Sequence, residues 1–448
     1  MVHFKAVVYK LSFIAVCVCS VISGCSRSSE LEWNDEDGYR WTDVDPGWFG
    51  ETGFEPLSPS RTNIHFENQV TDEEIVKNRH YLNGSGVTAG DVDGDGLVDL
   101  YFAGLNGPNK LYKNQGNMEF RDITEESGTA HEGYYSTGVL FADVDGDADL
   151  DLFVGSFHKG VTLYINNEEG QFTTANQNQF NDTSGKGNTT LAMADIDSDG
   201  DLDLYVTNYK EITVKDIYST EELEWNNILN EPFNEQNQTG PFTLVPPFDK
   251  HYKIYMTDAN KLAGIAESGE KDELYINEGG TFRKVENTDQ IFLDEDGEPL
   301  GLEKEWGLTA KFQDLNNDGY PDLYVCNDYF SKDRMWINQG DGTFRALPKE
   351  AIRNMSFASM GVDFSDINHD GHLDIFVTEM LSPLHERRQQ QVGADDPTYR
   401  RYYLTDHQPQ YNRNSLYLKR EDNTYAEIAY YSGVEATEWS WATRFMDV

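Results

Sequence analysis

A nine-residue acidic segment recurs along this chain and restricts its possible folds more than any other feature. Each copy has Asp or Asn at position 3 and Asp at positions 1, 5 and 9. The starts of the five full copies lie 52, 52, 119 and 52 residues apart, and the last two residues of the sequence, from Asp447, match the start of a sixth. A period of about 50 residues indicates one supersecondary unit used several times. The full copies begin at Asp91, Asp143, Asp195, Asp314 and Asp366.

The residues around each copy predict four short β-strands per repeat. An apolar or small-residue segment precedes the acidic copy, and a run such as 100–102 (Leu-Tyr-Phe) follows it. A third run, such as 111–114 (Leu-Tyr-Lys-Asn), is followed by a glycine-containing turn and an aromatic residue, Phe120 in the first repeat. Four strands per repeat are typical of a propeller blade, which cannot bury its faces alone. We therefore predict an all-β fold, a β-propeller of four-stranded blades, over residues 61–448.

Two insertions explain the irregular spacing of the repeats. The last Asp of the acidic segment precedes the third strand by about a dozen residues in three repeats. The distance is 71 residues from Asp203 to Leu274 and 42 residues from Asp374 to Leu416. Both long gaps fall between the second and third strands. We predict insertions at about residues 208–273 and 379–415, on the face of the propeller opposite the acidic loops.

The acidic segments are candidate calcium sites. Clustered carboxylates repel one another, and calcium takes six to eight oxygen ligands in a tolerant geometry. A helical calcium loop needs an acidic residue at position 12, but Phe or Val stands there, so the loop closes at position 9 and continues into a strand. A solvated acidic turn is the alternative for any single copy, whereas five copies in one strand context favour about five Ca²⁺ sites. Position 6 is Gly except at Ala148, so we expect positive φ there and strain in the second loop.

The candidate ligands occupy alternate positions of each loop and include side chains together with one carbonyl. They are Asp91, Asp93, Asp95, Leu97 and Asp99; Asp143, Asp145, Asp147, Asp149 and Asp151; Asp195, Asp197, Asp199, Asp201 and Asp203; Asp314, Asn316, Asp318, Tyr320 and Asp322; and Asp366, Asn368, Asp370, His372 and Asp374.

The N-terminal residues predict that the protein is exported. Lys5 and Lys10 precede an apolar run, residues 11–22, which is too short to span a bilayer. It ends in Ile-Ser-Gly-Cys, which resembles a bacterial lipobox. We predict a signal peptide at 1–24, lipidation of Cys25, a tether at 25–60 and an outer-membrane or cell-surface location with membrane contact through the lipid only. The alternative is an ordinary secretory signal with a chance cysteine. Cys326 then remains as a lone, buried structural thiol.

The net charge of the chain and the motifs that it lacks limit the classes of function that we expect. The chain has 79 acidic and 35 basic residues, a net charge of −44, which disfavours nucleic acid as a partner. It contains no nucleophile elbow, HExxH motif or phosphate loop, so we expect a protein that is not an enzyme. The alternative function is a catalytic or non-catalytic part of an extracellular polysaccharide-degrading enzyme.

The acidic loops, the Leu-Tyr-x-Asn strands and the aromatic fourth strand resemble FG-GAP or VCBS repeats, as in the integrin α-subunit propeller. Residues 83–91 and 439–442 are similar to bacterial relatives of the cartilage acidic protein family. That resemblance implies a propeller that commonly has seven blades and a C-terminal ASPIC/UnbV domain, of which the sequence shows no trace. Because the sixth copy contains only two residues, we expect further repeats in a longer protein.

The second insertion is the candidate partner surface, for an extracellular protein or a glycan. Arginines and tyrosines gather there although basic residues are scarce in the chain, and arginine with aromatic side chains is typical of binding surfaces. The alternative is that the aromatics pack the insertion onto the propeller and the arginines neutralise nearby acids. The candidate residues are Arg387, Arg388, Arg400, Arg401 and Tyr402.

Overall fold

The computed structural model describes residues 54–446, except 235, 258, 330 and 392–407, together with two short strands near the N-terminus. It divides the chain into two units, Leu57–Met446 and the remainder. In the smaller unit, β1 (Asn34–Glu36) pairs with antiparallel β2 (Tyr39–Trp41). Cys25 and Asp447 lie outside the described residues. Within that described part, no helix has the length and apolar character that a membrane span requires.

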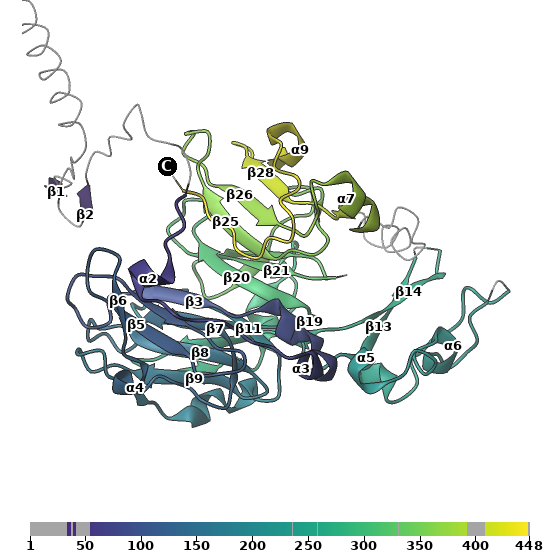
Figure 1. Cartoon of the computed structure of the whole chain (residues 1–448). Coiled ribbons are helices and arrows are strands. Elements are labelled where there is room, and N and C mark those ends of the chain that lie inside the picture. Colours follow the sequence, from purple (N-terminus) through teal and green to yellow (C-terminus); the bar gives the residue numbers. More distant parts are fainter. Residues whose placement is uncertain are drawn as a thin grey trace, which may run out of the picture. The chain divides into compact units, whose positions relative to one another are not determined.

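The larger unit contains five sheets in which four strands follow one another in chain order, and we call these sheets blades 1 to 5 (Figure 1). Adjacent strands of a blade are antiparallel, so the all-β prediction and the four strands per repeat are confirmed. The strands are β3 (Val87–Gly90), β4 (Asp99–Phe102), β5 (Lys110–Asn114) and β6 (Phe120–Asp122) in blade 1; β7 (Tyr135–Ala142), β8 (Asp151–Phe157), β9 (Gly160–Ile165) and β10 (Thr173–Thr174) in blade 2; β11 (Asn188–Ala194), β12 (Asp203–Asn208), β16 (Glu273–Asn277) and β17 (Phe282–Lys284) in blade 3; β20 (Gly307–Gln313), β21 (Asp322–Asn327), β22 (Arg334–Asn338) and β23 (Phe344–Ala346) in blade 4; and β25 (Gly361–Ser365), β26 (Asp374–Thr378), β28 (Ser415–Lys419) and β29 (Tyr425–Glu427) in blade 5.

The hydrophobic core lies between successive blades. The first strands contact one another in the order β3, β7, β11, β20 and β25. Between blades 2 and 3, Phe153 of β8 packs with Leu191 and Leu204 of β11 and β12. Similar clusters join blades 1 and 2, blades 3 and 4, and blades 4 and 5. Burial of each such side chain contributes about 1.5–3 kcal/mol, so a blade is stabilised by its neighbours rather than by itself.

Both insertions connect the second strand of a blade to the third, as the spacing predicted. The first, in blade 3, has its own apolar cluster around Ile228, Phe248 and Ile265. It contains α5 (Val214–Ile217), α6 (Trp225–Ile228), η3 (Phe248–Lys250), β13 (Tyr252–Met256), β14 (Leu262–Glu267) and β15 (Glu270–Lys271). The second, in blade 5, contains α7 (His385–Gln391) and β27 (Gln410–Tyr411).

Short elements precede blade 1, connect successive blades or follow blade 5. They are α2 (Pro59–Thr62), α3 (Asp72–Lys77), η1 (Arg79–Asn83), α4 (Thr124–Ser127), η2 (Gln177–Thr183), η4 (Thr288–Gln290), β18 (Phe292–Leu293), β19 (Lys304–Glu305), β24 (Met355–Ser356) and α9 (Ala429–Ser432).

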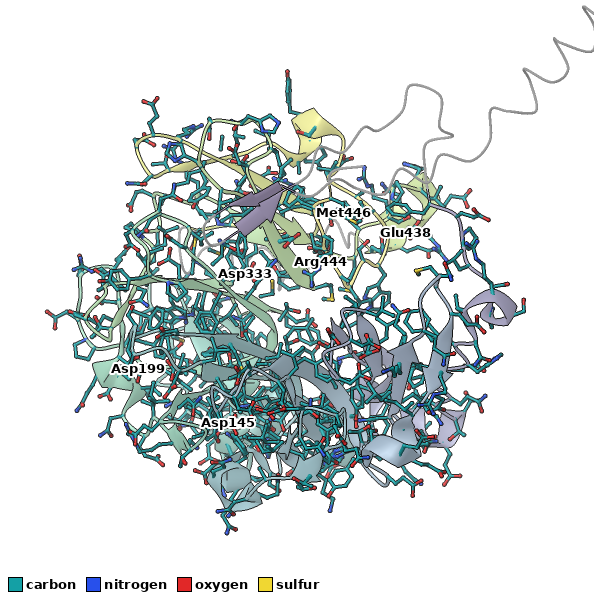
Figure 2. All side chains as sticks on the ribbon, turned by 90° about the vertical axis from the view of Figure 1, so that its left-hand side faces the viewer. Asp145, Asp199, Asp333, Glu438, Arg444 and Met446 are labelled. Atoms are coloured by element: carbon teal, nitrogen blue, oxygen red, sulfur yellow. The ribbon has the colours of Figure 1, made fainter. Side chains whose placement is uncertain are left out.

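The final described segment runs beside blade 5. The Thr443 and Thr378 hydroxyls are 2.8 Å apart, and the Phe445 N–H donates to Asp363 Oδ2 at 2.6 Å. Arg444 and Met446 of this segment are labelled in Figure 2. The segment therefore contacts β25 in blade 5, much as β25 itself contacts β20 in blade 4.

Candidate metal sites

The five acidic segments form loops at the same place in each blade, where each connects the first strand to the second. We number these loops 1 to 5 by blade. The expected positive φ at position 6 is confirmed, for example 99° at Gly200. Ala148 adopts φ of 73° in loop 2, a conformation that costs a non-glycine residue free energy. The sequence-predicted residues of each copy are therefore brought into one tight turn.

The first Asp of each loop closes the turn by accepting backbone hydrogen bonds. Asp91 accepts from the N–H groups of Asp95 (3.1 Å) and Gly96 (2.8 Å). Loops 3, 4 and 5 repeat this pattern. Loop 2 differs, since Asp143 accepts from Gly146 and Ala148. The loop that lacks glycine at position 6 is thus also the loop with altered hydrogen bonding.

The Asp at position 9 joins the loop to the third strand. Asp203 is buried, and its two oxygens accept from the N–H groups of Ile196 at 3.2 Å and Asn277 at 2.8 Å. Every loop has this pair of bonds. Burial raises the pKa of Asp203, and those of Asp151 and Asp322, to about 7, and neighbouring carboxylates add to the effect.

An Asn at the end of the third strand, or directly after it in blade 2, connects two successive loops, a role that sequence reasoning missed. Asn166 of blade 2 donates its side-chain amide to Val92 O of loop 1 at 2.8 Å. Asn277 and Asn338 donate in the same way to loops 2 and 3, each at 2.9 Å. In blade 5 the position is Lys419, whose ammonium donates to Leu315 O of loop 4. The repeated Leu-Tyr-x-Asn pattern marks these Asn residues in the sequence, but it does not indicate that they donate to a loop of the preceding blade.

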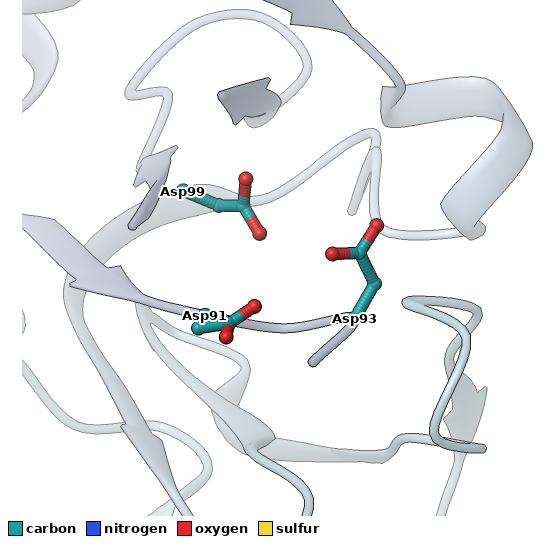
Figure 3. Close-up of side chains that lie close together, drawn as sticks. All are labelled: Asp91, Asp93 and Asp99. Atoms are coloured by element: carbon teal, nitrogen blue, oxygen red, sulfur yellow. The ribbon is translucent and has the colours of Figure 1, made fainter. Parts of the chain in front are cut away.

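Carboxylates converge in loops 1 to 3. In each of these loops, three Asp residues offer oxygens that all lie within 4.8 Å of one another. Figure 3 shows the set from loop 1, Asp91, Asp93 and Asp99, directed toward a common space. The sets in loops 2 and 3 are Asp143, Asp145 and Asp151, and Asp195, Asp197 and Asp199.

Two carboxylate oxygens of the loops are buried without a hydrogen-bond donor. Asp93 Oδ1 and Asp149 Oδ1 are buried and have no hydrogen-bond partner. A buried oxygen without a donor is costly unless a cation or another polar group satisfies it. Carboxylate oxygens around a tight turn are the ligands that calcium prefers. The donor set therefore fits Ca²⁺, and calcium binding itself stays a prediction.

Loops 4 and 5 have fewer carboxylates, because Asn316 and Asn368 replace the Asp at position 3. Each amide donates to the Asp at position 5, at 2.8 Å to Asp318 and 2.9 Å to Asp370. An amide donor relieves part of the repulsion within the loop without a metal. The five copies are thus not equivalent as candidate metal sites.

Position 7 has two roles. In loops 2 and 3, the carboxylates of Asp149 and Asp201 accept from the turn that follows the third strand, at Glu168 (2.5 Å) and Gly279 (2.7 Å). In all five loops, the backbone N–H of this residue also donates to the Asp at position 5, at 2.9–3.1 Å. In loops 1, 4 and 5 the residues at position 7 are Leu97, Tyr320 and His372.

The candidate partner residues are described in part. Arg387 and Arg388 form ion pairs of 3.2 Å with Glu438 and Glu435, in the segment that follows α9. Arg400, Arg401 and Tyr402 lie outside the described residues. The two described arginines therefore contact acids, as the alternative interpretation expected. The Cys326 thiol is fully buried, and burial raises its pKa, in agreement with a structural thiol.

Comparisons with known proteins agree with the repeat architecture. Residues 91–154, 143–206 and 314–377 match an FG-GAP-like repeat. Cartilage acidic protein 1 of Mus musculus is 28% identical over 176 residues, which cover 38% of this chain and 26% of the relative. Its Homo sapiens counterpart is 25% identical over 176 residues, with 38% and 25% covered. The chain thus spans about a quarter of the length of the curated relatives it matches.

Two solved structures are distantly similar to this chain. An Agrocybe aegerita lectin that recognises non-reducing terminal N-acetylglucosamine has a TM-score of 0.33 and 17% identity, covering 76% of this chain and 78% of the lectin. An α-L-arabinofuranosidase from Clostridium thermocellum has a TM-score of 0.32 and 9% identity, covering 78% and 96%. Likenesses at this level carry no argument about function.

Proposed function

We propose that this FG-GAP repeat protein, a relative of cartilage acidic protein 1, is a calcium-binding propeller module that binds an extracellular protein or glycan at the cell surface. The single observation that carries the proposal is the convergence of three carboxylates in each of loops 1 to 3. Two unit charges 4 Å apart repel by about 4 kcal/mol near a protein surface. A divalent cation removes this cost, so calcium would stabilise the blades.

Calcium binding is tested by titration calorimetry and thermal melting in calcium, magnesium or EDTA. A site whose dissociation constant is a hundredfold below the free calcium concentration adds about 2.7 kcal/mol of stability. We expect the melting temperature to fall in EDTA and to recover with calcium more than with magnesium. Absence of both binding heat and a change in the melt would contradict the proposal.

Two double variants test whether the effect of calcium on the melting temperature depends on the acidic loops. Asp145→Asn with Asp197→Asn removes one carboxylate from loop 2 and one from loop 3. Glu169→Gln with Glu286→Gln removes two exposed carboxylates from outside the five loops. We expect the first pair to reduce calcium binding and the EDTA sensitivity of the melt, and the second pair to change neither.

The second insertion is the proposed partner surface. The side chain of Arg387 is 66% exposed, and Tyr430 and Tyr431 on α9 are 63% and 92% exposed. Arg413 lies over the Tyr430 ring at 4.8 Å, which places α9 beside the end of the insertion. Exposed aromatic rings beside arginines suit a sugar ring or a protein side chain. This composition supports a binding role rather than catalysis.

The surface is tested on a panel of immobilised polysaccharides and extracellular matrix proteins. The variant that replaces Arg387, Arg388, Arg400 and Arg401 by Ala is expected to lose capture. Arg283→Ala is the control, because Arg283 also forms an exposed ion pair, 3.4 Å from Glu278 in blade 3. Capture that is retained in the fourfold variant would exclude this surface.

Surface attachment is proposed through a lipid on Cys25, from the lipobox-like sequence alone. Mass spectrometry of the mature N-terminus is expected to find a diacylglycerol on that cysteine. Cys25→Ala should release the protein from the membrane fraction, and an unmodified mature N-terminus would contradict the anchor.

A further inference from the structure

Loop 1 contains a positive charge supplied by its own blade. The ammonium of Lys113, on β5, contacts Asp93 Oδ2 and lies 3.0 Å from Asp95 Oδ2. The exposed fractions are 26% for Lys113, 13% for Asp93 and 33% for Asp95, so Asp93 is the most shielded of the three side chains. Lys113 therefore lies against two of the carboxylates that were expected to bind calcium in this loop.

Lys113 has no equivalent in the other blades. It lies one residue before Asn114, the residue equivalent to Asn166 in blade 2 and Lys419 in blade 5, and each other blade has an aliphatic side chain at the position of Lys113. Loops 2 and 3 consequently have carboxylate sets without a lysine from the third strand. The aliphatic residues are Ile165, Ile276, Ile337 and Leu418.

The electrostatics of the loops differ accordingly. In loop 1 the Lys113 ammonium forms ion pairs with Asp93 and Asp95. In blades 2 and 3 the equivalent third-strand residues are Ile165 and Ile276, which carry no charge. The repulsion that a metal ion relieves is therefore partly neutralised in loop 1 and persists in loops 2 and 3.

We infer that Lys113 is an intramolecular cation that takes the place of calcium in loop 1, so that calcium binds preferentially to loops 2 and 3. The inference rests on the proposed calcium binding and assigns it to particular blades. A tethered ammonium is present at a high effective concentration, so free calcium must displace it before binding. The displaced ammonium would then remain close to a divalent ion, which disfavours the exchange further.

Blade 5 supplies a second lysine to a neighbouring loop. Lys419 is buried, and its ammonium donates to Leu315 O of loop 4. Loop 4 also has Asn316 in place of an Asp. Lysine thus accompanies two of the five loops, and neither loop 2 nor loop 3 is among them.

The test removes the lysine from this position in blade 1 and introduces one at the equivalent position in blade 2, in the full chain. Lys113→Met removes the ammonium from loop 1, and Ile165→Lys places one at loop 2. Bound calcium is counted by equilibrium dialysis with radioactive calcium, and melting is followed in calcium and in EDTA. Lys110→Met is the matched control, because Lys110 lies on the same strand and pairs at 2.8 Å with Asp122, away from the loop.

We expect Lys113→Met to bind one more calcium ion than the wild type, or to bind in loop 1 at least tenfold more tightly. Its melting temperature should fall in EDTA and recover in calcium. Ile165→Lys should bind one ion fewer and become less sensitive to EDTA, and Lys110→Met should bind as the wild type does.

The outcomes separate this inference from the proposed function. A wild-type protein that binds no calcium would overturn both. A wild-type protein that binds calcium, with the same number of ions and the same affinities in Lys113→Met and Ile165→Lys, would overturn the inference alone. If Lys113→Met does not fold, Ile165→Lys decides by itself, because loss of one ion supports the inference and full binding refutes it.

Discussion

Replacing Asp151 tests whether the Asp at position 9 holds each loop to its blade. The side chain of Asp151 is fully buried and accepts from Val144 N at 3.2 Å and Asn166 N at 2.9 Å. Asp151→Ala leaves both N–H groups without an acceptor. A buried, unsatisfied donor costs about 1–3 kcal/mol, so the sum is about 2–6 kcal/mol. Because the substitution also relieves carboxylate repulsion in the loop, we expect about 2–3 kcal/mol of net destabilisation. Asp151→Asn keeps one acceptor and should lose about half as much.

The assay combines urea unfolding in EDTA with amide hydrogen exchange. EDTA removes any calcium contribution, so that the loss reports the two hydrogen bonds. In Asp151→Ala, the amides of Val144 and Asn166 should lose protection, whereas Ile196 and Asn277 in blade 3 should keep it as internal controls. The reasoning is refuted if the Val144 and Asn166 amides stay protected and the urea midpoint is unchanged.

Three further predictions follow from local geometry. Ala148→Gly should stabilise the protein by about 0.5–1 kcal/mol in urea unfolding, because glycine adopts positive φ freely, and Gly200→Ala should destabilise it; equal midpoints would contradict this. Burial raises the pKa of Asp333 to about 7. The native state therefore holds a proton that the unfolded chain loses near pH 4, so stability in EDTA should fall as pH rises from about 4 to 7. Asp333→Asn should flatten this slope, and an unchanged slope would exclude that group. Cys326 should react with a thiol reagent only on unfolding, and rapid native modification would show an open site.

The strands and loops were predictable because their signals are local and repeated. A run such as Leu204–Val206 has strand-forming residues, and the acidic copy before it fixes where the turn lies. The position of both insertions followed from spacing alone. Positive φ at position 6 followed from glycine, and its persistence at Ala148 shows that the loop imposes the conformation on the residue.

Contacts between blades were not predictable in the same way. The amide of Asn166 reaches a carbonyl 74 residues earlier in the chain, and nothing near Asn166 indicates that partner. Lys113 is visible in the sequence as a lysine among aliphatic equivalents, but only the fold shows that its ammonium enters the acidic loop. The ion pairs of Arg387 and Arg388 likewise depend on a segment about 50 residues further on.

The first insertion has its own apolar cluster, so it is a segment that can be exchanged for another. Because Ile228, Phe248 and Ile265 pack within the insertion, exchanging this segment need not disturb the apolar contacts that join blades 2, 3 and 4. A family built on this scaffold could therefore change what it displays by replacing a single connection. Selection on the displayed segment would then be largely decoupled from selection on the fold.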